Sequence, residues 1–250
     1  MAYRILFSNM GYAKGINGSL FQHAAYITRH FYTPHNVQKR ALEQFGEIIA
    51  AENPDLCCIV EIDGGSVHAG YFDQIGMLKS KTYEFHDISD KYGPQNVLGR
   101  LPFHKGKSNA FMAKQNIEFE KRYLSRGSKK LLYSLILPGD IILFFAHFSL
   151  NRKVRLAQFH ELKKHLHDHA KVIVLGDFNI MHGFSELEPL LLDTDLQLLN
   201  RDDEPTFKLH KRNHVLDLCL CSKSLAGNLK LKVIPQPFSD HAALLVDIDT

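Results

Sequence analysis

The chain has 250 residues, of which 45% are hydrophobic and 23% are charged, and its formal net charge is +3 at pH 7. These values exclude a disordered or fibrous protein, and they permit an anionic partner without requiring one. No apolar run approaches the roughly 20 residues that span a bilayer, and the N-terminus has no basic stretch followed by a long apolar one. The sequence therefore predicts no transmembrane segment, no signal peptide and a cytoplasmic location.

Apolar runs of strand length alternate with helical patterns along the chain. The predicted strands are residues 3–8, 56–60, 110–113, 131–137, 141–145, 171–175, 215–221 and 243–248. Apolar residues at helical spacing predict helices over residues 34–52, 152–169 and 186–192. This alternation indicates a layered α/β fold. Since no repeat or flexible linker interrupts it, we expect residues 1–250 to form a single domain.

The four cysteines and two long connections complete this description. Cys57-Cys58 and Cys219-x-Cys221 lie inside predicted strands, which favours buried reduced thiols over a disulfide framework or a metal site. Residues 10–33 are rich in Gly, Tyr and His, and residues 87–108 are polar and basic. We expect both stretches to be loops, and long loops in compact domains are commonly functional.

Polar residues recur at the ends of the predicted apolar strands. They are Asn9, Glu61, His147, Asp177, Asn179, Asp217, Asp240 and His241. Each one alone fits a turn former, a partly exposed histidine or a core carboxylate. Together they indicate a site, because a carboxylate at the end of a buried strand is costly unless it is paired or binds a metal. Oxygen and imidazole ligands without thiolates suit a Mg²⁺-type ion.

The stretch KVIVLGDFNIM, residues 171–181, shows the pattern most clearly. We expect Gly176 to let the chain turn after the buried strand without placing a Cβ near the site. Side-chain alternation would put Asp177 and Asn179 on one side of the chain and Phe178 on the other, in apolar packing.

Several short motifs follow one another in an order that is known from one superfamily. They are SN at 8–9, VE at 60–61, AHFS at 146–149, R-x-x-Q-x-x-x-L at 155–162, GDFN at 176–179, LD at 216–217 and SDH at 239–241. In this order the chain resembles the endonuclease/exonuclease/phosphatase superfamily, which has the deoxyribonuclease I-like fold. The resemblance implies an α/β four-layer sandwich of two packed, mostly antiparallel mixed β-sheets flanked by helices.

The resemblance also implies a metal cofactor, Mg²⁺, with Mn²⁺ able to replace it. Glu61 would be the principal metal ligand, with Asn9 beside it and Asp240 close by. A site so sparse in protein ligands is expected for Mg²⁺, which keeps several of its waters.

The same resemblance implies catalytic roles. Asp177 would orient and deprotonate the attacking water, and Asn179 would hold the scissile phosphate or the nucleophile. His147 and His241 would donate hydrogen bonds to the non-bridging oxygens as charge builds in the transition state. Asp217 would fix the tautomer of His241. Hydrolysis of a phosphate ester needs this combination of a base and donors.

The sequence departs from several branches of the superfamily. The chain has no Trp, which disfavours the abasic-site endonucleases, and its GDFNIM and LDLCL stretches disfavour the inositol polyphosphate 5-phosphatases. Secreted sphingomyelinases and deoxyribonuclease I need an export signal, and because the sequence predicts none, we disfavour these branches as well. The interval between Asn9 and Glu61 is longer than in many members, so we expect residues 10–33 to be an insertion beside the active site, with a packed helical excursion as the alternative.

Candidate substrate contacts lie in the loops and at one strand start. Lys14 stands among aromatic and basic residues in 10–33, a mixture that suits phosphate contact and base stacking. Arg100 lies in the basic loop, and Asn109 begins NAFMA, which is similar to the family's GNAILS element. Lys105 and Lys107 could simply be solvated.

Three functions remain open from the sequence. The first is a Mg²⁺-dependent phosphodiesterase acting on nucleic acid, that is, a nuclease for DNA or RNA. The alternative is a phosphatase or phosphodiesterase for a small or lipid phosphate, such as a phosphoinositide, a nucleotide or a phospholipid head group. A non-catalytic binding module is the weakest hypothesis, because the implied catalytic set is complete. The oligomeric state is not predicted.

Overall fold

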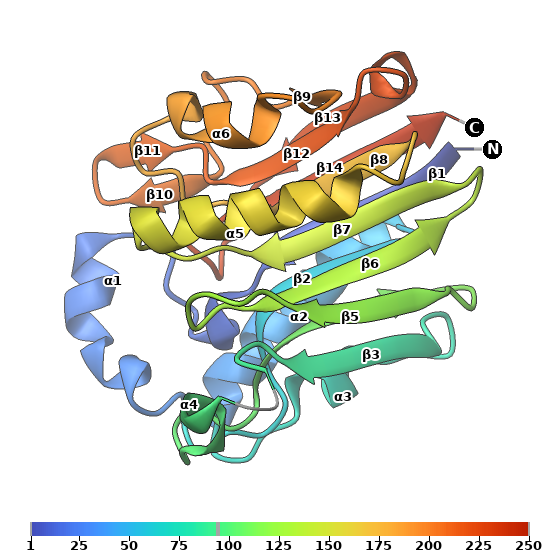
Figure 1. Ribbon diagram of the computed structural model, residues 1–250. Coiled ribbons are helices and arrows are strands. Elements are labelled where there is room, and N and C mark those ends of the chain that lie inside the picture. Colours follow the sequence, from blue (N-terminus) through green and yellow to red (C-terminus); the bar gives the residue numbers. More distant parts are fainter. Residues whose placement is uncertain (1, 94–95, 250) are drawn as a thin grey trace.

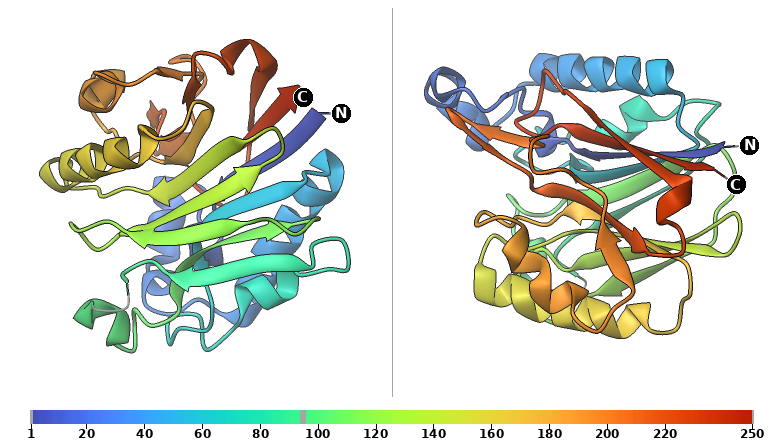
Figure 2. Two further views of the ribbon diagram at one scale, coloured as in Figure 1. Left: turned by 45° about the vertical axis from the view of Figure 1, so that its right-hand side comes forward. Right: turned by 90° about the horizontal axis from the view of Figure 1, so that it is seen from above.

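Two β-sheets packed face to face form the centre of the computed structural model. It describes residues 2–93 and 96–249, without the side chains of His23, Leu98 and Arg100. Within these residues the strands form two six-stranded sheets and a two-stranded hairpin. Helices cover the outer face of each sheet, so that the view from above in Figure 2 shows four layers. The fold class predicted from the sequence is confirmed.

The first sheet contains both ends of the chain. Its order is β13 (Leu229–Ile234), β14 (Ala243–Asp249), β1 (Ala2–Asn9), β2 (Leu56–Asp63), β4 (Lys107–Ala113) and β3 (Phe85–Asp90). β1 and β2 are parallel, and the other neighbours are antiparallel. β1 and β2 therefore end at the same edge of the sheet, on the left in Figure 1.

The second sheet repeats this arrangement. Its order is β5 (Phe119–Tyr123), β6 (Leu131–Leu137), β7 (Ile141–His147), β8 (Val172–Asp177), β12 (Asp217–Ser222) and β9 (Leu196–Leu198). β7 and β8 are parallel, and the other neighbours are antiparallel. The separate hairpin joins β10 (Phe207–Leu209) to β11 (Arg212–His214).

Helices fill the connections between the strands. The α-helices are α1 (Leu20–Ala25), α2 (His35–Glu52), α3 (Gln74–Leu78), α4 (Val97–Arg100), α5 (Arg152–Leu166) and α6 (Glu188–Leu191). Short 3-10 helices cover Gly11–Ala13, Ile27–His30, Phe184–Leu187 and Ala226–Asn228. α2 lies on the first sheet, and α5 with α6 lies on the second. In the described part of the chain no helix is long and apolar enough to cross a membrane.

Three apolar layers hold the sandwich together. The layer between the sheets includes Ile5, Phe7, Cys58, Phe145, Leu175 and Leu244. The layer under α2 includes Leu6, Phe45, Ile49, Cys57 and Leu245. The layer under α5 includes Phe144, Phe159, Leu162, Val174 and Leu218. Neighbouring strand residues such as Cys57 and Cys58 serve different layers, which explains why the strands read as continuous apolar runs. All four cysteines are buried free thiols.

One predicted loop is in part a strand. β3 (Phe85–Asp90) occupies the start of the stretch 87–108, and α4 lies within it. β3 lies at the edge of its sheet, and none of its residues is fully buried, so it carries no apolar run. β5 and β13 were not predicted for the same reason, since each is an edge strand with at most one buried residue.

We had expected Gly176 to let the chain turn, and this prediction is wrong, because Gly176 lies within β8. A Cβ on Gly176 would lie 2.4 Å from the carbonyl oxygen of Ala146, its neighbour on β7. Glycine is needed here because two backbones approach closely at the last rungs of the sheet.

Gly176→Ala should therefore lower the free energy of unfolding by about 3 kcal/mol, because the backbone of β7 has to move. Gly46→Ala is the matched control, since Gly46 lies within α2 and an added Cβ meets nothing within 4 Å. That change should raise stability by roughly 0.5–1 kcal/mol. Urea denaturation measures both, and equal stabilities of the two variants would refute the close-approach explanation.

Candidate active site

The register of the second sheet places three polar residues in a row. His147 ends β7 and pairs with Asp177, which ends β8, and Asp177 pairs in turn with Asp217 at the start of β12. Asn9, at the end of β1, reaches across from the first sheet, and its Nδ2 donates to Asp177 Oδ2 at 3.0 Å. The ends of four strands therefore meet at Asp177.

The buried carboxylate of Asp177 has polar partners on both of its oxygens. Its Oδ1 accepts a hydrogen bond from the backbone N–H of Asn179 at 3.0 Å, and Nε2 of His147 lies 3.0 Å from its Oδ2. Burial would raise the pKa of Asp177, but His147 and His241 outweigh it and hold this pKa well below its usual range. Asp177 is consequently a carboxylate at neutral pH.

His241 lies between two carboxylates. Its Nδ1 donates to Asp217 Oδ2 at 2.7 Å, and its Nε2 lies 3.9 Å from Asp177 Oδ2. The ring packs on Phe207, with 4.7 Å between centroids. Burial would lower the pKa of His241, but Asp217 and then Asp177 raise it to about 10. His241 is therefore an imidazolium at neutral pH.

His147 is in the opposite state. Burial and the neighbouring ammonium of Lys129 lower the pKa of His147 to about 4, although Asp177 opposes them. His147 is neutral at pH 7, and Lys129, which contacts its Nε2, carries the positive charge on this side of the site.

Glu61 lies at an irregularity in β2, where the pairing with β4 shifts between Ile59 and Ile62. Its φ is 54°, and its backbone N–H donates to Oδ1 of Asn109 at 3.3 Å. Burial would raise the pKa of Glu61, but His147, Lys91 and Lys129 lower it well below its usual range. The bulge therefore presents an ionised carboxylate to the site.

Four of the nine residues other than glycine with left-handed backbone in the described part of the chain belong to the site or to the segment beside it, and the other five lie elsewhere. Tyr12, Ala13, Glu61 and Asn179 have φ values of 58°, 53°, 54° and 52°. Such conformations are costly for residues other than glycine and occur preferentially at functional sites. Asn179 therefore does not continue the extended chain as we had expected, and its Nδ2 donates to the carbonyl of Phe148 at 2.9 Å. Phe178 does pack against Phe148, in the apolar layer under α5.

Glu61 and Asp240 line a small cavity of about 90 Å³ together with Lys14 and His241. Burial raises the pKa of Asp240, and Glu61 raises it further although His241 opposes this. A cation between the two carboxylates would relieve this repulsion, so the residues fit a divalent metal. Asn9 lies at the edge of this group, where its Oδ1 accepts a hydrogen bond from the N–H of Gly11.

A second acidic group lies on the other side of His241. One ligand atom each of Asp177, Asp217 and His241 lies within 4.8 Å of the others. Nδ1 of His241 is already bound to Asp217 and the ring is positively charged, which suits a hydrogen-bonded relay better than a metal ligand.

Three lysines gather beside the site, of which Lys14 was predicted, Lys107 was left open as a solvated residue, and Lys91 was not predicted. The ammonium groups of Lys14, Lys91 and Lys107 lie 5.3, 4.9 and 5.1 Å from the ring centroid of Tyr12. Lys91 is buried and contacts the Tyr12 hydroxyl, and its Nζ lies 3.9 Å from Glu61 Oε1. Burial and the other lysines lower the pKa of Lys91 to about 7, although Glu61 opposes this. The cluster is poised to receive negative charge.

The R-x-x-Q pattern on α5 supports the site from behind. Gln158 accepts from the N–H of Ser149 at 2.9 Å and donates to the carbonyl of Lys129 at 2.6 Å. Arg155 is buried, pairs with Glu186 and donates to the carbonyl of Ser149. These bonds fix the loop after His147 and the segment that carries Lys129.

The structure gathers most of the predicted residues. Those that meet around one centre are Asn9, Lys14, Glu61, Asn109, His147, Asp177, Asn179, Asp217, Asp240 and His241. Asn109 supports the backbone of Glu61, and the side chain of Arg100 lies outside the described residues. Lys91 and Lys129 were not singled out in the sequence, and Lys107 was considered only as part of the basic loop, with a solvated position as its alternative.

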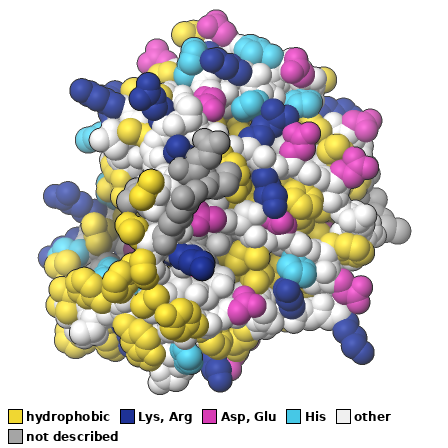
Figure 3. Space-filling model, turned by 60° about the horizontal axis from the view of Figure 1, so that its bottom comes forward, with side chains coloured by type: hydrophobic (Ala, Val, Ile, Leu, Met, Phe, Trp, Pro, Cys, Tyr) yellow, Lys and Arg dark blue, Asp and Glu magenta, His cyan; other side chains and the backbone are white. Residues whose placement is uncertain are grey.

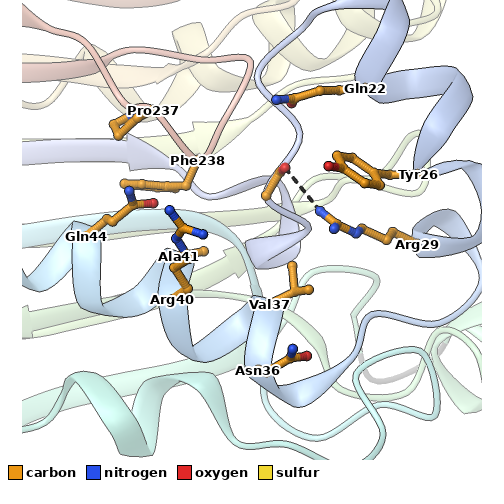
Figure 4. Close-up of a pocket in the computed structure, with 11 residues that line it drawn as sticks. Gln22, Tyr26, Arg29, Asn36, Val37, Arg40, Ala41, Gln44, Pro237 and Phe238 are labelled. Carbon is orange, nitrogen blue, oxygen red and sulfur yellow. Dashed lines mark hydrogen bonds between the residues drawn. The ribbon is translucent and has the colours of Figure 1, made fainter.

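A larger pocket of about 490 Å³ adjoins this centre. It lies between residues 15–29, α2 and Phe238, and Figure 4 shows Arg29 and Arg40 reaching it from opposite walls. Phe238 lines both this pocket and the small cavity with Glu61.

Known structures share this architecture at low sequence identity. The truncated TDP2 of Caenorhabditis elegans aligns with a TM-score of 0.67 at 14% identity, covering 100% of this chain and 98% of that one. The human Nocturnin catalytic domain with bound sulfate aligns with a TM-score of 0.65 at 18% identity, covering 98% of this chain and 93% of that one. The endonuclease domain of TRAS1, a telomere-specific non-LTR retrotransposon, aligns with a TM-score of 0.61 at 13% identity, covering 99% of each chain. These likenesses support the fold alone.

The sequence itself matches a family model. A search of curated proteins finds no match. Residues 35–241 match the model of the Endonuclease/Exonuclease/phosphatase family, so the family predicted from the motifs is confirmed. The chain belongs to the endonuclease/exonuclease/phosphatase family, whose members are divalent-metal-dependent hydrolases of phosphoester bonds.

Proposed function

We propose that the chain is a Mg²⁺-dependent phosphodiesterase, organised as one domain with residues 10–33 as an insertion beside the active site. The observation that carries this proposal is the convergence of an ionised Asp177, a protonated His241 and the Glu61–Asp240 cavity at one edge of the sandwich. A base, a charged donor and a cation site are what hydrolysis of a phosphate ester requires.

Each residue has a role that follows from its contacts. Asp177 accepts a proton from the attacking water, and its remaining hydrogen bonds hold its orientation. His241 donates from Nε2 to an oxygen of the phosphate, because its Nδ1 is held by Asp217. Neutral His147 is a hydrogen-bond donor or acceptor, and Lys129 supplies charge beside it.

Glu61 and Asp240 would hold the metal ion, with Asn9 at its side. When bound, the ion stabilises negative charge on the phosphate oxygens. Asn179 orients its side chain by donating to Phe148, which leaves its oxygen to position the nucleophile or the phosphate. Lys14 extends into the same cavity and suits a substrate oxygen.

Removal of the metal tests this part of the proposal. We expect EDTA to abolish hydrolysis of bis-p-nitrophenyl phosphate and Mg²⁺ or Mn²⁺ to restore it. Titration calorimetry gives a readout independent of turnover, and Glu61→Gln should weaken Mg²⁺ binding by about tenfold or more, because it removes a charged ligand. Glu47→Gln, an exposed change on α2, is the matched control. Full activity in EDTA would refute the metal requirement.

The substrate has two candidates. Nucleic acid is supported by the lysines around Tyr12, which can neutralise a phosphate backbone. A lipid phosphate is supported by exposed apolar side chains beside the site, which a nucleic acid does not require.

Lys91→Met should raise the KM for an anionic substrate about tenfold and change kcat little, because a phosphate is bound equally before and during reaction. Lys105→Met is the control, since Lys105 is exposed. Steady-state kinetics decide the result, and equal KM values for the two variants would remove Lys91 from the substrate site.

A further inference from the structure

Exposed apolar side chains gather on the segment between β1 and α2. We call Leu20, Phe21, Ile27, Phe31 and Tyr32 the apolar rim, and Phe21 and Phe31 are 77% and 71% exposed. Figure 3 shows hydrophobic side chains gathered at the lower left of its face, on the side where α1 lies in Figure 1. A patch of this kind commonly marks an interaction site.

The rim belongs to a segment that is anchored by its polar side. Arg29 Nη1 donates to the carbonyls of Lys14 and Gly15 at 3.1 and 3.3 Å. Its guanidinium stacks on Tyr26 at 3.6 Å, as Figure 4 shows, and its own carbonyl lies 2.9 Å from Nε2 of His68. These polar groups point toward the protein, and the apolar side chains of the same segment are exposed to solvent in a fixed arrangement.

The rim is connected to the active site by the chain itself. Lys14, six residues before Leu20, lines the cavity with Glu61 and Asp240. A second exposed apolar group, Val97, Leu101 and Phe103, precedes Lys107 on the other flank. Both lysines lie near the Tyr12 ring. An occupant of the two apolar groups would therefore present its anionic groups to the lysines.

Charge favours an anionic occupant. Residues 10–33 and 91–117 contain no Asp or Glu. Among their cationic residues, Lys14, Lys105 and Lys107 are at least partly exposed, whereas Lys91 is buried, Arg29 is bonded to backbone carbonyls and Lys114 pairs with Asp55. Apolar side chains flanked by Lys and Arg are the composition of segments that lie in the interface of anionic bilayers.

We infer that the apolar rim inserts into the surface of an anionic phospholipid bilayer and that the substrate is a phosphate ester of the lipid head groups there. This inference rests on the proposed function and names its substrate class. Aromatic residues alone would also suit stacking on nucleic acid bases. The two apolar groups also contain aliphatic side chains, which cannot stack on bases but pack well against acyl chains; these are Leu20, Ile27, Val97 and Leu101.

The test uses vesicles of equal parts phosphatidylcholine and phosphatidylglycerol, with pure phosphatidylcholine vesicles beside them. We expect the wild type to co-sediment with the anionic vesicles and the double variant Phe21→Ser, Phe31→Ser to bind about a hundredfold more weakly, since two inserted rings are lost. The double variant Ile136→Ser, Leu192→Ser is the matched control, because both residues are exposed on other elements. It should bind like the wild type.

Hydrolysis of bis-p-nitrophenyl phosphate separates this inference from the proposed function. The rim variant should retain wild-type turnover of this soluble substrate, which also shows that it is folded. The lipid inference is wrong if the wild type hydrolyses bis-p-nitrophenyl phosphate but does not bind anionic vesicles. It is also wrong if the rim variant binds these vesicles as well as the wild type does. Loss of single-stranded DNA binding in the rim variant, without vesicle binding by the wild type, would assign the surface to nucleic acid instead. A wild type without turnover would contradict the proposed function itself.

Discussion

Asp177→Asn should lower the kcat for bis-p-nitrophenyl phosphate by about a thousandfold or more. A positioned general base contributes roughly 10²–10⁴ in rate, and the amide cannot accept the proton of the attacking water. The change keeps the side-chain volume, so the buried position between β7 and β12 stays filled.

Asp195→Asn is the control for this prediction, because it makes the same chemical change at an exposed carboxylate. Its kcat should equal that of the wild type. Circular dichroism should show both variants folded. A folded Asp177→Asn enzyme with a rate within a few-fold of the wild type would remove Asp177 from the role of base.

His241→Gln should lower kcat by about 10²–10³, the usual cost of losing a donor that stabilises transition-state charge. The imidazolium is the positively charged donor held by Asp217 Oδ2 at 2.7 Å, and a neutral amide cannot replace it. His160→Gln, on the exposed face of α5, is the control. Equal rates for the two variants would show that His241 does not contribute.

Asp217 acts on the reaction through His241 in this account. Burial lowers the pKa of His241 and Asp217 is the strongest influence that raises it, so Asp217→Asn should move the alkaline limb of the rate–pH profile to lower pH. The wild type, with the His241 pKa at about 10, keeps this limb at higher pH. A shift of this limb to higher pH would show that Asp217 does not raise the pKa of His241.

The sequence identified the residues whose positions follow from strand ends. Asn9, His147 and Asp177 close buried strands. His147 and Asp177 meet because β7 and β8 are parallel, and Asn9 reaches Asp177 from the facing sheet. Short motifs in a fixed order then identified the family. Edge strands such as β3 gave no signal, because alternation is weak where both faces are partly exposed.

The details of the site depend on contacts that no local pattern encodes. The left-handed backbone of Glu61 lies at a bulge in β2, and that of Asn179 lies in the loop just after β8. Lys91 and Lys129 reach Glu61 from distant segments, and their separation in sequence hides their convergence. The reason for Gly176 is likewise a contact between strands.

A substrate panel tests the central claim most directly. Purified wild type and Asp177→Asn are compared on DNA, RNA, nucleotides, inositol phosphates and anionic phospholipid vesicles, each with Mg²⁺ and with EDTA. Our account predicts that the wild type cleaves at least one phosphoester substrate, and that both EDTA and Asp177→Asn abolish this cleavage. Cleavage that persists unchanged in the variant, or in EDTA, would contradict the account.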